Sequence, residues 1–144
     1  LVVCLMGRVH MPTCDDPFRT VDSVLMKERA DLVIVDMHAE ATSEAQAMGF
    51  HLEGRAAAVL GTHTHVGTLD AKVLAGGTAY VSDIGMTGPY DGVIGMKKEA
   101  SLGRFLKVIR PKYEVAESDL QLHAVLVTTE GRKATGIERI LRRL

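Results

Sequence analysis

The stretch Ala56-Ala57-Ala58-Val59-Leu60-Gly61-Thr62-His63-Thr64-His65 joins a short apolar run to a pair of histidines. The apolar part has the length of a buried strand, and a glycine ends it. A second run, Asp31–Met37, is β-branched in its middle and apolar on both faces, as buried parallel strands are, and His38 follows it. Side chains just beyond the carboxyl ends of such strands share one edge of an open sheet, where ligands bind. We therefore expect His38, His63 and His65 to meet at that edge.

Strand and helix patterns alternate around these runs. We predict strands at Leu1–Met6, Asp31–Met37 and Ala56–Leu60 and helices at Thr20–Arg29 and Ser43–Leu52, the second capped by Ser43 or Thr42. This order predicts an α/β fold with right-handed crossovers. The later part predicts a hairpin of 72–74 with 78–82, a glycine-rich loop at 83–96, a helix at 98–109 ended by Pro111, and strands at 121–129 and 134–144.

Length and composition favour one soluble domain over residues 1–144. The net charge of −1 does not indicate nucleic acid or an anionic membrane as a partner, and no apolar run reaches the roughly 18 residues that a membrane helix needs. Two cysteines are too few for a disulfide framework, so we expect free thiols and a cytoplasmic location. The chain begins without Met in the middle of a strand pattern, and we expect an upstream part to be missing.

The pair His63 and His65 is the first candidate for chemistry. On an extended chain, residues two apart point to the same face, so both rings could reach one site. Imidazole binds zinc, iron, manganese, nickel and copper, so the pair does not select a metal. Two polar loop residues, or one hydrogen-bonded core histidine, would explain the same pattern.

Carboxylates near the histidines are candidates for orienting them. Asp36 and Glu40 flank His38, and Asp83 follows the strand at 78–82. A solvated loop carboxylate is the simpler interpretation of Glu40, and spacing alone favours an ordinary turn-rich loop around Asp83. Glu44 falls in the first turn of the predicted helix at Ser43–Leu52, where the helix dipole favours a negative charge.

Other polar residues carry weaker signals. Arg8, His10 and Arg19 lie in or beside the first loop, where arginine could bind a phosphate or simply be solvated. His51 and His123 have no partner at ligand spacing, so we treat both as structural.

Three motifs together closely resemble the YmdB-type branch of the calcineurin-like metallophosphoesterases. They are Gly61-Thr-His-Thr-His-Val, Asp36-Met-His-Ala-Glu-Ala-Thr-Ser-Glu and Ser82-Asp-Ile-Gly-Met-Thr-Gly-Pro-Tyr-Asp, with Leu5-Met-Gly-Arg-Val and Asp16-Pro-Phe-Arg in addition. The resemblance covers nearly the whole chain but only about the carboxyl-terminal half of the family's domain.

The resemblance implies part of a four-layer α/β/β/α sandwich and a two-metal site, usually iron or manganese with zinc as an option, that hydrolyses 2′,3′-cyclic nucleotides. It places His38 and His63 on one metal and His65 on the other. The family's early aspartate, bridging glutamate and Asn-His pair would precede Leu1, and that histidine would be the general acid. Two-metal catalysis needs the bridging ligand. We therefore assign no catalytic or substrate-binding residue and expect the isolated chain to be inactive.

Three hypotheses remain open at this point. The first is that the chain is half of a dinuclear phosphodiesterase. It predicts an unpaired sheet edge near Leu1–Met6, through which copies of the chain could associate. The second is a complete hydrolase holding one zinc on His38, His63 and His65. The third is a non-catalytic interaction module.

Overall fold

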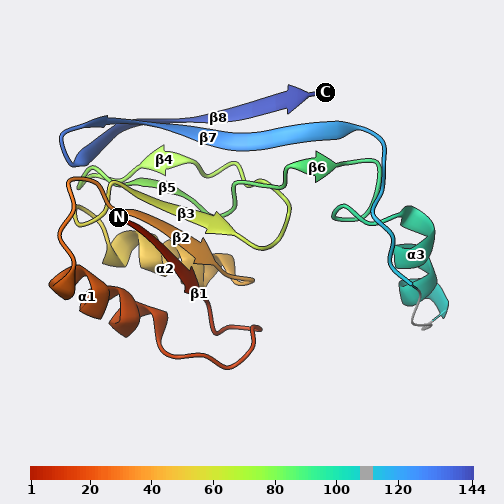
Figure 1. Cartoon of the computed structure of the whole chain (residues 1–144), viewed down its shortest axis with the longest axis horizontal. Coiled ribbons are helices and arrows are strands. Elements are labelled where there is room, and N and C mark those ends of the chain that lie inside the picture. Colours follow the sequence, from red (N-terminus) through yellow and green to blue (C-terminus); the bar gives the residue numbers. More distant parts are fainter. Residues whose placement is uncertain (108–111) are drawn as a thin grey trace.

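The computed structural model describes residues 1–107 and 112–144, and Figure 1 shows the course of the chain. Strands and helices alternate at first, in the order β1 (Val2–Met6), α1 (Pro17–Lys27), β2 (Ile34–His38), α2 (Thr42–His51) and β3 (Ala58–Thr62). The later elements are β4 (Lys72–Val73), β5 (Ala79–Val81), β6 (Gly88–Pro89), α3 (Lys98–Lys107), β7 (Leu120–Glu130) and β8 (Lys133–Arg143). This order confirms the predicted α/β class with antiparallel hairpins in the later part.

A five-stranded sheet with strand order β1-β2-β3-β5-β4 forms the centre of the molecule. Strands β1, β2, β3 and β5 are parallel, and β4 returns antiparallel to β5 as the predicted hairpin. The carboxyl ends of the parallel strands therefore lie at one edge, which we call the carboxyl edge. The register aligns Met6 with His38 and His38 with Thr62, so three strands end level with one another. Strand β1 is an outer strand of the sheet in the described part of the chain.

Helices α1 and α2 cover one face of this sheet (Figure 1). Alternate strand residues point into that core, as the two-residue period of a strand requires. The core on this face contains Val3, Leu5, Val35, Met37, Val59 and Tyr80 from the sheet and Val21, Ala45, Met48 and Leu52 from the helices.

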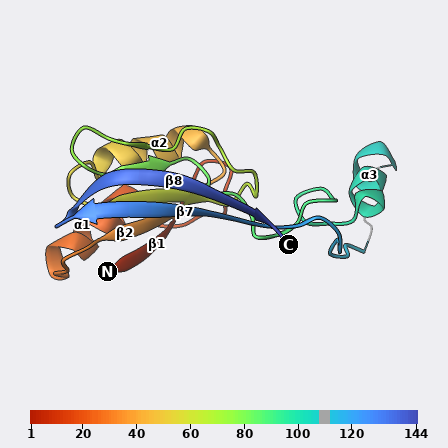
Figure 2. The ribbon, with the colours of Figure 1, turned by 90° about the horizontal axis from the view of Figure 1, so that it is seen from above.

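The β7–β8 hairpin covers part of the opposite face. Small side chains at the contact, Ala58, Ala79 and Ala134, are buried and let the two sheets approach closely. Figure 2, turned by a right angle, shows the hairpin lying across the sheet and α3 standing away from it. The described residues thus build the α/β/β layers of the predicted sandwich.

The first helix begins earlier than the sequence pattern predicts. Its N-cap is Asp16, whose side chain accepts hydrogen bonds from the backbone N–H groups of Phe18 (2.9 Å) and Arg19 (3.3 Å). Pro17 occupies the first turn, where its missing N–H costs nothing and its fixed φ suits a helix. The predicted start at Thr20 was wrong because this proline opens the helix instead of interrupting a loop.

Other boundaries differ by smaller amounts. Neither Ser43 nor Thr42 caps α2, because Ala41 holds the N-cap position and no side chain makes a capping bond there. Strand β3 continues through Gly61 to Thr62, beyond the predicted end. The tail is a strand, as predicted, and pairs with β7 in a long hairpin. The predicted helix end at Ile109 and Pro111 lies outside the described residues.

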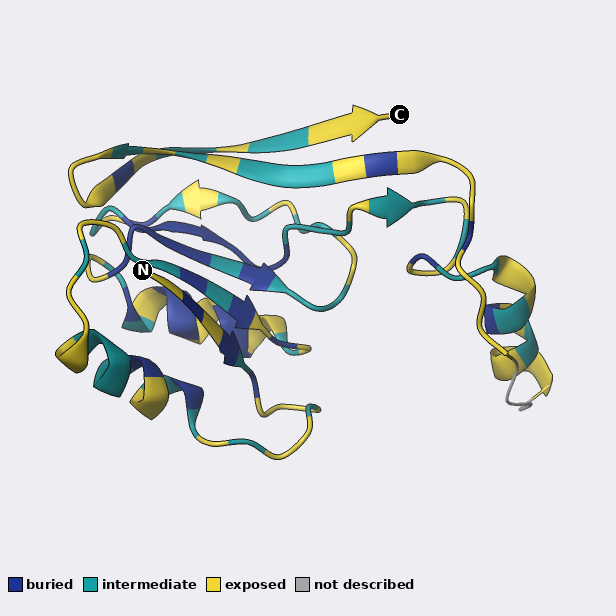
Figure 3. Cartoon of the chain, in the orientation of Figure 1, coloured by how far each residue is buried: buried dark blue, intermediate teal, exposed yellow. Residues whose placement is uncertain are grey.

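Burial follows this layered arrangement (Figure 3). The most deeply buried residues lie in strands β2, β3 and β5 and on the sides of α1 and α2 that face the sheet, whereas most of α3 is exposed. None of the helices over residues 1–107 and 112–144 has the length and hydropathy required to cross a bilayer.

Candidate metal centre

Two histidine side chains meet where β2 and β3 end. His38 is the last residue of β2, and His63 directly follows β3. The Nε2 atom of His38 lies 3.0 Å from the Nδ1 atom of His63. Their ring centroids are 4.6 Å apart, and the ring planes are nearly perpendicular at 82°. The parallel register thus brings together two of the three histidines expected at the carboxyl edge.

The backbone around the histidine pair is strained. His63 has φ 112° and His65 has φ 66°, in the left-handed region that residues with a side chain rarely adopt. Such strain is characteristic of functional sites and persists only where the surroundings enforce it. The assumption of an extended chain, which placed His63 and His65 on one face, was therefore wrong.

Asp83 is the residue that enforces this turn. Its side chain is buried, with only 1% exposed. The carboxylate accepts hydrogen bonds from the backbone N–H of Thr64 (2.8 Å), from the Thr64 hydroxyl (2.8 Å) and from the N–H of Gly85 (2.7 Å). Within the described chain its hydrogen bonds go to loop groups and not to an imidazole ring. Asp83 thus holds the residue between the two histidines instead of orienting a ring directly.

His65 points to a different partner from His63. Its Nδ1 lies 3.1 Å from the carbonyl oxygen of Ile94, in the glycine-rich loop. Over residues 1–107 and 112–144, no group of three or more His, Cys, Asp or Glu side chains is arranged to hold a metal ion. The described part of the chain therefore offers one imidazole pair and a separate third imidazole.

The two other candidate carboxylates contact the pair in different ways. Glu40 Oε2 lies 3.1 Å from His63 Nε2. Asp36 reaches His38 through a residue that the sequence interpretation missed: the Thr62 hydroxyl lies 2.7 Å from Asp36 Oδ1 and 3.0 Å from His38 Nδ1. Only the strand register, which pairs His38 with Thr62, shows that this hydroxyl faces the ring.

The separation of the facing nitrogens fits a metal centre. Two imidazole nitrogens bound at right angles about 2.1 Å from one cation would lie about 3.0 Å apart. His38 Nε2 and His63 Nδ1 show this separation. The chemistry of the pair is therefore suitable for two neighbouring ligands of one divalent ion, with the other ligands supplied from elsewhere.

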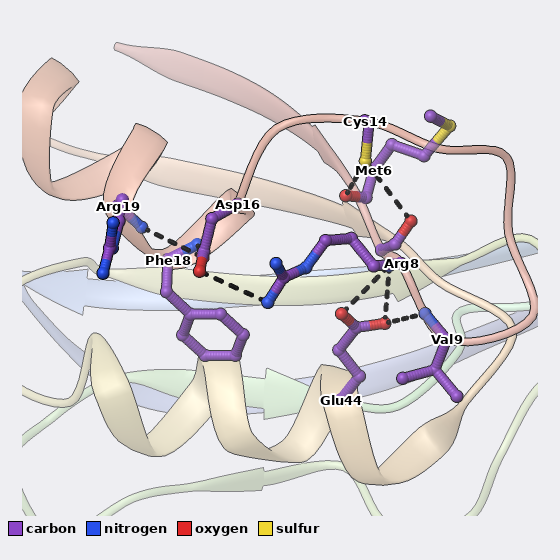
Figure 4. Close-up of polar contacts among 9 residues, drawn as sticks. Met6, Arg8, Val9, Cys14, Asp16, Phe18, Arg19 and Glu44 are labelled. Atoms are coloured by element: carbon purple, nitrogen blue, oxygen red, sulfur yellow. Dashed lines mark hydrogen bonds and ion pairs between the residues drawn. The ribbon is translucent and has the colours of Figure 1, made fainter.

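The loop after β1 is anchored by the buried Glu44 (Figure 4). The Gly7 N–H donates to the His38 carbonyl oxygen at 2.8 Å. The Glu44 carboxylate accepts from the backbone N–H of Arg8, 3.0 Å from each oxygen, and from that of Val9 at 3.2 Å. Glu44 therefore does more than place a charge in the first helical turn.

The arginines of this region pair with or cap protein groups. The Arg8 guanidinium lies 3.2 Å from Asp16, and the backbone N–H of Arg19 donates to the same carboxylate (Figure 4). His10 is exposed, with φ 60°. Within the described residues the Arg8 guanidinium thus pairs with Asp16 and not with His38 or His63. A role of Arg8 and Arg19 in binding phosphate stays a prediction.

The two remaining histidines contact protein groups away from the pair. His51 Nε2 lies 3.0 Å from Asp22 Oδ1. His123 Nε2 lies 3.1 Å from Gln121 Oε1, and its ring stacks on Tyr90 at 4.5 Å. Burial, together with the positive charge of Arg139, lowers the pKa of His123 below its ordinary value. The neutral ring is thus the form that suits this position.

Comparison with known proteins gives the family. A model described as YmdB-like protein matches residues 1–140. The chain belongs to the YmdB-like protein family. Among its relatives, a 2′,3′-cyclic-nucleotide 2′-phosphodiesterase of Bacillus subtilis (strain 168) is 45% identical over 144 residues, which is 97% of this chain and 54% of the relative.

Two solved structures of high similarity agree with this assignment. A hypothetical protein from Thermus thermophilus superposes with a TM-score of 0.96 at 46% identity, covering 99% of this chain and 56% of that one. A novel phosphatase from Mycoplasma pneumoniae gives 0.92 at 34% identity, covering 99% and 52%. The chain thus spans about half the length of these three proteins.

Proposed function

We propose that this protein is a metal-dependent phosphodiesterase that hydrolyses 2′,3′-cyclic nucleotides at a dinuclear centre. The observation that carries the proposal is the imidazole pair, His38 Nε2 and His63 Nδ1, facing each other at 3.0 Å on the carboxyl edge. Membership of the YmdB-like family and the phosphodiesterase relative of Bacillus subtilis support the substrate class.

The chain would supply the histidine ligands of that centre. In the proposal His38 and His63 bind one cation, and His65, which lies apart from them, binds the second. The remaining ligands would come from the part of the relatives' length that this chain does not span, so that residues 1–144 form the carboxyl-terminal half of a metallophosphoesterase domain. Iron or manganese is the expected metal, with zinc as the alternative.

The protein groups around the pair have roles that follow from their contacts. The Glu40 carboxylate, 3.1 Å from His63 Nε2, would hold the ring in place and raise its basicity as a ligand. Asp83 holds Thr64, and therefore the turn that separates His63 from His65. When bound, divalent cations would supply polarisation of a phosphoryl oxygen.

Three further statements stay predictions. They are the small-molecule nucleotide as substrate, the cytoplasmic location, and assembly into a homo-oligomer. The predicted cytoplasmic location rests on the low number of cysteines, which are Cys4 and Cys14.

The test measures metal binding and turnover separately. Mn²⁺ affinity of the chain should fall in His38→Ala and His63→Ala and stay unchanged in His51→Ala, whose ring contacts Asp22 away from the carboxyl edge. The chain alone should not hydrolyse 2′,3′-cyclic AMP. Joining it to the segment of the Bacillus subtilis relative that it does not span should restore hydrolysis, and His63→Ala should abolish that activity.

Metal counting separates the proposal from the other two hypotheses. One tightly held zinc per chain, lost together in the His38, His63 and His65 variants, would favour a single-zinc hydrolase. A folded protein that takes up no metal at neutral pH would favour a non-catalytic module. Only two of the three imidazoles converge, which supports the dinuclear proposal over the single zinc.

A further inference from the structure

A threonine hydroxyl lies between a carboxylate and one of the two facing imidazoles. Thr62 Oγ1 is 2.7 Å from Asp36 Oδ1 and 3.0 Å from His38 Nδ1. His38 and Thr62 end β2 and β3, and Asp36 lies two residues before His38 in β2, so all three point to the face away from α1 and α2. The three groups form a chain of hydrogen bonds on a rigid scaffold.

The direction of each bond follows from what the groups can donate. A carboxylate only accepts, so the single hydroxyl proton of Thr62 goes to Asp36. The hydroxyl then offers only a lone pair to His38, and the Nδ1 atom of that ring must carry its proton. The neutral imidazole has one N–H, which leaves Nε2 of His38 with a free lone pair.

The partner ring faces that bare nitrogen. His63 Nδ1 lies 3.0 Å from His38 Nε2 within a hydrogen bond, so with Nε2 bare the N–H belongs to His63 Nδ1. Glu40 Oε2 lies 3.1 Å from the other nitrogen of His63 as an ion-pair contact. His38 thus presents a lone pair at the place where a cation would replace the shared proton.

We infer that Thr62 is a positioning residue, which fixes His38 in the tautomer whose Nε2 binds metal by directing its own proton to Asp36. The inference rests on the proposed function, because it assigns Thr62 a role at that metal centre. A simple core threonine would satisfy its hydroxyl without determining the state of a ligand. Orienting partners of this kind are worth about 10- to 100-fold in metal affinity.

The first test reads the tautomer directly and needs no metal or activity. Long-range ¹H–¹⁵N spectra of the metal-free protein at pH 8 should show His38 with a protonated Nδ1 and a bare Nε2. Thr62→Val keeps the side-chain shape but removes the hydroxyl, and should move His38 toward the Nε2–H form. Thr62→Ser keeps the hydroxyl and should resemble the wild type. A wild-type His38 protonated on Nε2 would overturn the inference.

The second test measures Mn²⁺ affinity by the EPR signal of the free ion. Thr62→Val should weaken binding about 10- to 100-fold, whereas Thr62→Ser should stay close to the wild type. Thr128→Val is the matched control, because Thr128 lies near the β7–β8 turn at the other end of the sheet. Equal losses in the Val and Ser variants, or no loss in either, would overturn the role of the hydroxyl.

The two proposals fail in distinguishable ways. Unchanged Mn²⁺ affinity in His38→Ala and His63→Ala would refute the proposed metal centre, whatever the state of Thr62. Loss of affinity in those variants without an effect of Thr62→Val would refute the positioning role alone.

Discussion

Replacing Glu44 gives the sharpest test of how the loop after β1 is held. The Glu44 side chain is 8% exposed, and its carboxylate accepts from the backbone N–H groups of Arg8 and Val9 (Figure 4). Hydrogen bonds to a charged group contribute about 1.5–3 kcal/mol each. Because these bonds are partly buried, we take the lower value for both and expect Glu44→Ala to lower the free energy of unfolding by about 3 kcal/mol.

Urea denaturation followed by circular dichroism measures this difference. In a chain of this size the loss corresponds to a melting temperature lower by about 6–12 °C. Glu44→Gln provides the matched variant, since its amide oxygen can still accept from Arg8 and Val9 while the charge is removed. We expect it to cost about half as much as the alanine variant, or roughly 1.5 kcal/mol.

A different outcome follows if Glu44 acts only through the helix dipole. The interaction of a first-turn charge with the dipole is worth about 0.3–1 kcal/mol. Glutamine and alanine would then be equally costly, because both remove the charge. Equal losses below about 1 kcal/mol would refute the anchoring of the loop by Glu44.

Three further predictions concern other parts of the carboxyl edge and the hairpin. Gly61→Ala should destabilise the protein by about 3 kcal/mol or more in urea denaturation, because the added Cβ would overlap the backbone of Ser82, which directly follows the neighbouring strand β5. Asp83→Ala should cost about 3–5 kcal/mol in the same assay, since it removes a buried acceptor of three hydrogen bonds and leaves the half-buried Thr64 donors without it, and a loss under about 1 kcal/mol would contradict the role given to Asp83. The lowered pKa of His123 means that, as the pH falls below about 6.5, the unfolded chain takes up a proton that the folded chain resists, so stability falls. His123→Gln should flatten this dependence of the unfolding free energy on pH, and an unchanged slope would show that other groups cause it.

The sequence predicted the carboxyl ends of β2 and β3 only to within about two residues, which was enough to locate the imidazole pair. Two apolar runs of strand length, each followed by a histidine, were enough to place His38 and His63 at one edge, because parallel strands end on the same side. His65 was misplaced relative to His63 because the prediction assumed an extended chain. The left-handed φ angles that separate the two rings depend on Asp83, a residue distant in sequence.

The residues that support the pair could not be identified in the same way. Thr62 has no sequence signal of its own, and its role depends on the register that sets it beside His38. Glu44 fits a common pattern for the first turn of a helix, and only the folded chain shows that Arg8 and Val9 donate to it. Contacts between distant segments thus determine what sequence spacing leaves open.

Strand β2 contributes to two different environments with alternate residues. Val35 and Met37 lie in the core under the helices. On the other side of the strand, His38 belongs to the imidazole pair and Asp36 accepts the hydrogen bond of Thr62. An insertion or deletion of one residue in β2 would exchange these roles, burying a carboxylate and exposing a methionine at the ligand position. Natural length variation in this strand is therefore expected only in steps of two residues, and single-residue indels in a mutational library should abolish folding and metal uptake together.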